Sequence, residues 1–394
     1  MVLQFKEKIN NFYFVPSPIF TLVSVALCKF LYGFSISAIG SLLVPIGETF
    51  NINIKAQSAV FPFNYFGQIV IIFFIGYFAD KMGKKILQIG SLILFSLSAL
   101  LFNYINNFYL FLFMFFLVGL FGMSINTIAD ATISDIFSKK RGYYLNMAHV
   151  IGGMGAVTAP VLFNLSFSRT NDFRSLYFIL FLISIFIMIM ISVSHDPSVE
   201  IERVRPGIII EILKNRPFIY LCLFGLFSSG ALLSVSGWIP TIFQKNLNIS
   251  SEISNYSLAI FWFAIVAGRM VTGILSRRFK ETTLLKTACI AIFFVLSASF
   301  FFSDYLFLLI DYLLFGFLIG GTFPLLVAFS AEVYPKYSTT RLAILFSFTA
   351  AGMLLIPLVV GILGDYFMIN RIISFNSIIF LVYFVIFAKK INTF

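Results

Sequence analysis

The chain has 394 residues, of which 60% are hydrophobic, 18% are aromatic and 11% are charged, and its mean hydropathy is +1.00. This composition excludes a soluble globular protein and indicates an integral membrane protein. The apolar runs favour helices, because a backbone that spans a bilayer must satisfy its own hydrogen bonds. The net charge of +11 comes from basic residues dispersed among short segments, which favours contact with anionic lipid headgroups over nucleic acid.

Many apolar runs are long enough to cross a bilayer, which takes about 20 residues as a helix. They predict twelve transmembrane helices, in chain order at residues 19–44, 57–79, 86–104, 109–136, 144–166, 175–194, 217–243, 254–276, 283–302, 305–332, 341–363 and 371–388. The predicted fold class is therefore an all-α integral membrane protein. Basic residues between the spans gather on one side, for example at 84–85, 139–141 and 277–280. By the positive-inside rule, this predicts a multi-pass protein of the cell membrane with both termini in the cytoplasm.

The two halves of the chain repeat each other at an interval of 197 residues, which is half of 394. The pairs at this interval are Gly33 and Gly230, Gly76 and Gly273, Gly119 and Gly316, Asp135 and Glu332, Gly155 and Gly352, and Pro160 and Pro357. They predict a duplicated six-helix unit. Because each unit has an even number of spans, the two copies run parallel, with the substrate path between them.

A polar segment with two prolines separates the halves. It predicts an N-terminal six-helix bundle at 1–194, a cytoplasmic linker at 195–216 and a C-terminal six-helix bundle at 217–394. Within the linker, residues 208–213 have the pattern of a short amphipathic helix that lies on the inner membrane face.

The segment between the second and third predicted spans, residues 76–85, reads GYFADKMGKK. A turn this short and charged can join two membrane helices but cannot fold alone. We therefore expect it to act as a hinge or latch, whose contacts loosen when the two halves move against each other. The residues of this predicted latch are Gly76, Asp80, Lys81, Gly83, Lys84 and Lys85, with Asp135 at the inner end of the fourth span. The segment resembles the signature loop of the major facilitator superfamily of transporters. That resemblance implies two pseudo-symmetric six-helix bundles.

Other motifs resemble a narrower family, the sugar permeases related to bacterial fucose permease. They are 145–149 (LNMAH) followed by Gly153, Gly155, Ala156 and Pro160, then 238–241 (WIPT), 261–262 (FW), 268–269 (GR) and 320–326 (GGTFPLL). The resemblance covers nearly all of the chain. It implies secondary transport of a monosaccharide or related polyol by alternating access, often coupled to protons.

Polar residues of the fourth and fifth spans are the first candidates for a substrate site, because ionisable groups inside a membrane need a partner or water. Asn126 and Asp130 lie one helical turn apart, so they share a face where an amide and a carboxylate can bind sugar hydroxyls. Asn146 and His149 share a face in the same way. Asp130 and His149 can also carry a proton. For both, the alternative is a hydrogen bond or ion pair that holds helices together.

Further candidates lie on other spans. Asn64 and Gln68 share a face of the second span, and Trp238 and Trp262 offer flat apolar surfaces to a sugar ring. Glu48, near the outer end of the first span, is a third candidate for proton coupling.

Three intramembrane charges have an open role. Lys29 can neutralise Asp130, bind an anionic substrate such as a sugar acid, or snorkel to the interface. For Arg269 and Asp311 we expect structural pairing.

No motif indicates covalent chemistry, so we expect no enzymatic activity, no cofactor and no metal. The expected partners are a sugar-like small molecule, protons as a coupling ion and the lipid bilayer, without nucleic acid or an obligatory protein partner. Four alternatives stay open at this point. They are a facilitative sugar uniporter, an organic-anion or sugar-acid transporter, a drug or metabolite exporter, and a receptor of the same fold that does not transport.

Overall fold

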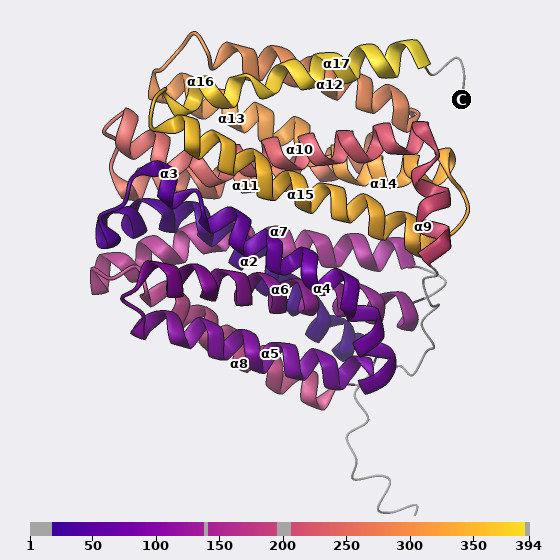
Figure 1. Ribbon diagram of the computed structural model, residues 1–394, viewed down its shortest axis with the longest axis horizontal. Helices are drawn as coiled ribbons and strands as arrows, with labels where there is room; N and C mark the ends of the chain where they lie inside the picture. The colour runs from indigo at the N-terminus through magenta and orange to yellow at the C-terminus, as the bar shows by residue number, and fades with distance from the viewer. Residues whose placement is uncertain (1–17, 138–140, 195–205, 391–394) are drawn as a thin grey trace, which may run out of the picture.

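The computed structural model describes residues 18–137, 141–194 and 206–390, and in these ranges it contains helices and no strand (Figure 1). Its elements are α2 (Pro18–Phe50), α3 (Ile54–Gln57), α4 (Val60–Met82), α5 (Lys84–Leu101), the 3-10 turn η1 (Phe102–Tyr104), α6 (Phe108–Ile136), α7 (Arg141–Thr170), α8 (Ser175–Val193), α9 (Pro206–Leu213), α10 (Arg216–Thr241), the π-helical turn η3 (Ile242–Asn246), α11 (Ser251–Leu275), α12 (Glu281–Ala298), α13 (Tyr305–Gly320), α14 (Thr322–Val333), α15 (Ser338–Gly364), α16 (Ile369–Ser374) and α17 (Asn376–Lys390). Within the described residues, 12 helical segments are long and apolar enough to span a membrane, as the sequence predicts.

The tenth span differs from the single helix expected at 305–332, because it is divided at Gly321 into α13 and α14. The cause is local. Pro324 has no N–H, so it cannot donate to the carbonyl of Gly320 four residues earlier, as a continuous helix would require. The first span also differs, since α2 continues to Phe50 and contains Pro45 without ending there.

Two bundles of helices lie side by side, with α2 to α8 in one and α10 to α17 in the other (Figure 1). The 197-residue repeat is visible in their packing, because α2 lies against α7 as α10 lies against α15. Glycine permits both close approaches. A Cβ added to Gly155 would collide with the Phe30 carbonyl, and one added to Gly352 would collide with the Leu226 carbonyl.

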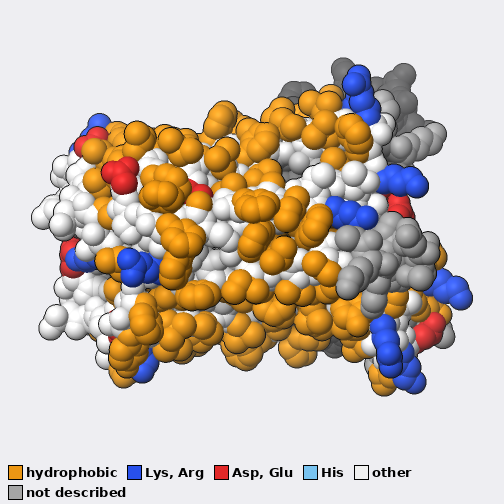
Figure 2. Space-filling model, turned by 90° about the horizontal axis from the view of Figure 1, so that it is seen from above, with side chains coloured by type: hydrophobic (Ala, Val, Ile, Leu, Met, Phe, Trp, Pro, Cys, Tyr) orange, Lys and Arg blue, Asp and Glu red, His pale blue; other side chains and the backbone are white. Residues whose placement is uncertain are grey.

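The helix bundle has two ends, which we name by the elements found there, the α3 end and the α9 end (Figure 1). Hydrophobic side chains cover the middle of the face shown in Figure 2, whereas Lys, Arg, Asp and Glu gather towards the two ends. This distribution is the one expected for a protein whose middle lies in hydrocarbon and whose ends meet water.

At the α3 end, several polar contacts join the two bundles. Lys245 Nζ lies 2.5 Å from Glu48 Oε1, and Asn53 Nδ2 donates to Asp365 Oδ2 at 2.8 Å. Asn164 Nδ2 donates to the carbonyl of Glu252 at 2.9 Å. The bundles are therefore held together at this end.

Candidate functional site

The fourth span supplies Asn126 and Asp130, and both bind Lys29 of the first span. Lys29 Nζ lies 2.5 Å from Asp130 Oδ2 and donates to Asn126 Oδ1 at 2.8 Å. The Lys29 side chain is only 1% exposed. Of the three alternatives for Lys29, this contact corresponds to neutralisation of Asp130, and the burial of Lys29 does not fit a side chain that snorkels to the interface. A buried ammonium is stabilised here by a carboxylate and an amide oxygen together.

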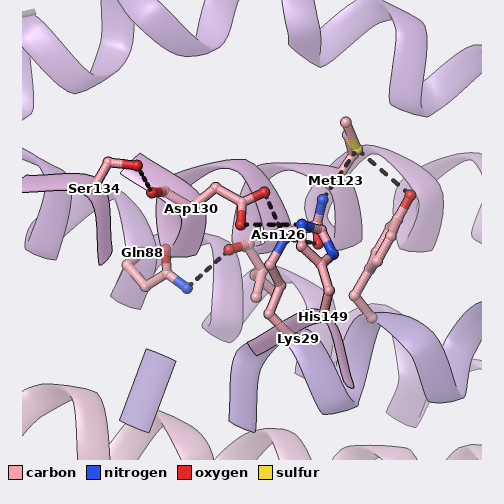
Figure 3. Close-up of polar contacts among 9 residues, drawn as sticks. Lys29, Gln88, Met123, Asn126, Asp130, Ser134 and His149 are labelled. Carbon is pink, nitrogen blue, oxygen red and sulfur yellow. Dashed lines mark hydrogen bonds and ion pairs between the residues drawn. The ribbon is translucent and has the colours of Figure 1, made fainter. Parts of the chain in front are cut away.

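His149 completes this group from α7, as Figure 3 shows, with its ring directed towards Asp130. Its Nε2 lies 3.8 Å from Asp130 Oδ1. The side chains of His149 and Asp130 are 43% and 31% exposed, although neither residue lies at an end of its helix. We name Lys29, Asn126, Asp130 and His149 the central cluster. Asn146, which the sequence places on the same face as His149, is exposed.

A second chain of hydrogen bonds runs beside the central cluster and contains the two predicted residues of α4. Tyr32 Oη donates to Gln68 Oε1 at 2.8 Å, Gln68 Nε2 donates to Asn64 Oδ1 at 2.9 Å, and Asn64 Nδ2 donates to the Phe115 carbonyl at 3.1 Å. Asn64 and Gln68 are 4% and 3% exposed, so in this conformation they hold helices together.

Sequence reasoning missed two members of this polar region. Tyr32 lies one helical turn after Lys29 on α2, and Gln88 of α5 donates to the Ile125 carbonyl at 3.2 Å behind Asn126. Tyr32 could have been identified from the sequence, because its spacing of three residues from Lys29 places both on one helix face. Gln88 had no such signal, because its two partners, Cys28 Sγ at 3.1 Å and the Ile125 carbonyl, lie on other helices.

The two tryptophans have different surroundings. Trp238 is fully buried, and its Nε1 donates to the Pro357 carbonyl at 3.2 Å, so its ring packs against protein, including Phe61 at 5.7 Å between centroids. Trp262 Nε1 is buried with no hydrogen-bond partner among the described residues. Of the two indoles, only that of Trp262 retains a free donor in this conformation.

Arg269 and Asp311 lie in the second bundle. Arg269 Nε donates to the Gly320 carbonyl at 3.3 Å, which is the carbonyl that Pro324 leaves free at the break between α13 and α14. Asp311 is 5% exposed, and its Oδ2 has no hydrogen-bond partner in the part of the chain that the structure describes. The expected structural contact is therefore present for Arg269, whereas that part of the chain supplies none for Asp311 Oδ2.

Glu48 lies at the α3 end, where it pairs with Lys245 across the two bundles. Its side chain is 64% exposed. This position is far along α2 from the central cluster, since Lys29 and Glu48 are 19 residues apart in one helix, or about 28 Å. Its role in proton coupling stays a prediction.

The predicted latch lies at the α9 end. Gly83 has a φ of 84°, a left-handed conformation that favours glycine, and it ends α4 directly before α5 begins. Lys84 forms an ion pair with Asp135 of α6, and Lys85 Nζ donates to the Ser194 carbonyl at 2.7 Å. Lys81 lies in the last turn of α4. Gly76 and Asp80 lie in α4, but the Asp80 side chain is outside the described residues, so its part in the latch stays a prediction.

The fold and this polar interior define a multi-pass membrane protein of two six-helix bundles. The sequence profile of the Major Facilitator Superfamily matches residues 25–338, so the chain belongs to that superfamily. The superfamily consists of transporters, and the chain is a transporter rather than an enzyme.

Several known proteins are similar to this chain. A protein called TsgA homolog from Buchnera aphidicola subsp. Baizongia pistaciae (strain Bp) is 24% identical over 92% of this chain and 94% of its own length. The glucose/mannose transporter GlcP of Bacillus subtilis (strain 168) is 23% identical over 55% of this chain and 56% of its own length.

Two solved structures share the fold at low sequence identity. The nucleoside transporter NupG superposes with a TM-score of 0.79 at 11% identity, covering 94% of this chain and 100% of that structure. A D-xylose-proton symporter superposes with a TM-score of 0.76 at 13% identity, covering 95% of this chain and 98% of that structure.

Proposed function

We propose that this transporter moves a monosaccharide or a similar small polar solute by alternating access, coupled to protons. The observation that carries the proposal is the central cluster. It places an ammonium, a carboxylate, an amide and an imidazole together inside the helix bundle, where the His149 and Asp130 side chains are partly exposed and the buried Asp130 Oδ1 has no hydrogen-bond partner among the described residues. Such a set can donate to and accept from several hydroxyl groups at once.

Asp130 and Lys29 provide a physical basis for coupling. The carboxylate holds the buried ammonium at 2.5 Å, and a proton on Asp130 would remove the negative charge that stabilises it. Lys29 would then keep its bond to Asn126 and take a bound solute as its second acceptor. The Asp130 carboxylate and a bound solute would thus compete for the same ammonium, so protonation of Asp130 would favour solute binding, which is the linkage that proton-coupled uptake requires.

Relatives support the chemical class. One relative is named as a glucose/mannose transporter, and one structural neighbour is a D-xylose-proton symporter. Because these likenesses are distant, they favour a sugar-like solute without specifying which.

The orientation and the domain limits belong to the same proposal. The bias of basic residues favours the α9 end as the cytoplasmic end, with N-terminal and C-terminal bundles at 1–194 and 217–394. The linker at 195–216 contains α9, whereas its residues 195–205 lie outside the described residues. Contacts at the α3 end would then close the outer side in this conformation.

Uptake into proteoliposomes tests the proposal. A panel of labelled monosaccharides is offered with and without an outside-acidic proton gradient, and we expect accumulation above equilibrium only with the gradient. Asp130→Asn should abolish accumulation while exchange across the membrane remains. Asp172→Asn, at an exposed carboxylate between α7 and α8, is the matched control and should accumulate as the natural chain does. Simple equilibration in the natural chain would reject coupling, and no entry of any sugar would reject the sugar-like substrate.

A further inference from the structure

We infer that the transported solute carries one carboxylate, as a uronic or aldonic acid does, and that Arg269 recognises it. This inference rests on the proposed function, because it names the substrate class of the same site. It follows from the charges, the helix register and the unsatisfied donors around Arg269.

The fixed charges in this region do not balance. Lys29 and Asp130 neutralise each other at 2.5 Å. Arg269 has a backbone carbonyl as its hydrogen-bond partner, and no described Asp or Glu lies within ion-pair distance of it. One unit of positive charge is therefore left without an anion among the described residues, in a setting where an uncompensated charge is costly.

Helix register places Arg269 opposite His149. Gly153 of α7 lies against Val266 of α11, and Asn164 of α7 bonds the backbone of Glu252. The two helices therefore run antiparallel, and the residue numbers at these contacts sum to 419 and 416. His149 and Arg269 sum to 418, which puts them at the same level on facing helices. A solute held by His149 in one bundle would thus meet Arg269 in the other.

Arg269 is held in a way that leaves its fork available. Its Nε donates to the Gly320 carbonyl at the break of the tenth span, which anchors the side chain. The four N–H donors on its two terminal nitrogens have no partner among the described residues. The two terminal nitrogens are also not buried, because no Arg269 atom is among the described polar atoms that are both buried and without a hydrogen-bond partner. Capping of the Gly320 carbonyl uses one donor of five, so capping alone does not explain a guanidinium at this position.

Trp262 adds a second donor on the same helix face. It precedes Arg269 by seven residues, two helical turns or about 10 Å, and its buried Nε1 has no partner among the described residues. A ring hydroxyl that accepts from this indole would leave the carboxylate end of a solute directed towards Arg269. Asn126 and His149 of the central cluster supply acceptors and donors for the remaining hydroxyls.

A carboxylate fits this arrangement better than a phosphate. The planar guanidinium fork of arginine matches the two oxygens of a carboxylate in bidentate geometry. A single surplus charge is balanced by one carboxylate, whereas a phosphate monoester carries about 1.5 to 2 negative charges at neutral pH.

The test compares matched solutes in proteoliposomes. Labelled D-glucose, D-glucuronate, D-gluconate and D-glucose 6-phosphate are offered to the natural chain, to Arg269→Gln and Arg269→Lys, and to the control Arg277→Gln. Arg277 is exposed just beyond the end of the same helix, so its loss should change nothing. We expect at least one of the two acids to enter about 10-fold faster than glucose at low concentration in the natural chain and in the control.

Arg269→Gln should raise the KM for the acid about 10-fold or more and the KM for glucose much less, a split that loss of a purely structural contact would not produce. If Arg269→Gln does not fold, Arg269→Lys tests the inference instead. It keeps the positive charge and loses the bidentate guanidinium, so the ratio of acid uptake to glucose uptake should fall. An unchanged ratio in a folded variant would overturn the inference. Preference for glucose or for the phosphate ester in the natural chain would also overturn it, while the proposed function would stand. If no compound enters, the proposed function itself fails.

Discussion

Glu48 and Lys245 form an ion pair of 2.5 Å between the two bundles, and they occupy equivalent positions of the repeat because 245 minus 48 is 197. The C-terminal ends of the first and seventh spans, which carry Glu48 and Lys245, thus meet between the two bundles. The repeat places these two positions at corresponding points of the two bundles, and the opposite charges of Glu48 and Lys245 join the bundles there. At 64% and 45% exposure, the pair faces water.

Charge reversal should show how much this pair holds the α3 end closed. Glu48→Lys and Lys245→Glu should each weaken closure, and the double exchange should restore it. Because the pair is exposed, the coupling should be no more than about 1 kcal/mol and should decrease with salt. Distance measurements between labels at the α3 ends of both bundles, at low and high ionic strength, would check this. Equal effects in the single and double variants would contradict a direct interaction.

Removal of one partner from the central pair should cost more. Lys29→Met leaves the Asp130 carboxylate without its cation, and Asp130→Asn leaves a buried ammonium, so each should destabilise the fold, by about 3 kcal/mol for the buried ammonium. In the double variant Lys29→Met with Asp130→Asn, neither charge remains, and part of the stability should return. Thermal unfolding of the purified protein measures this. Additive losses would show that the two residues do not depend on each other.

The latch has one pair that can be tested directly. Asp135→Asn removes the carboxylate that binds Lys84, so the link between α5 and α6 at the α9 end weakens. We expect a several-fold change in turnover with little change in substrate affinity, because the pair lies away from the central cluster. Measured KM and kcat of uptake separate the two effects. An equal loss of affinity would place Asp135 in the substrate site instead.

Glycine packing should be equally demanding in both halves. Gly155→Ala and Gly352→Ala each drive a methyl group into the backbone of a neighbouring helix, which should cost about 1 to 3 kcal/mol. Gly273→Ala is the matched control, because a Cβ there meets nothing within 4 Å. Its helical alanine should be neutral or slightly stabilising. Melting temperatures of the three variants would decide, and a loss at Gly273 as large as at Gly155 would reject steric packing as the cause.

The sequence by itself determined the class, the twelve spans and the repeat. Each depends on information that lies within one segment or in a comparison of two segments. A run of about 20 apolar residues must be helical in a bilayer whatever its neighbours are, and Gly155 and Gly352 show duplication by their numbers alone. The positions of Asn126, Asp130 and His149 on helix faces followed from the period of the helix.

Only the tertiary structure decided which charges meet. Lys29 and Asp130 are 101 residues apart, and their contact depends on the rotation and the axial shift of two helices packed against each other. The hydrophobic pattern of a membrane helix specifies neither the rotation nor the axial shift, because its apolar side chains can contact lipid as well as another helix on every face. The same reason applies to Arg269, which shares a level with His149 only because α7 and α11 lie in one particular antiparallel register. Local chemistry therefore sets the helices, while the packing of whole bundles sets the site.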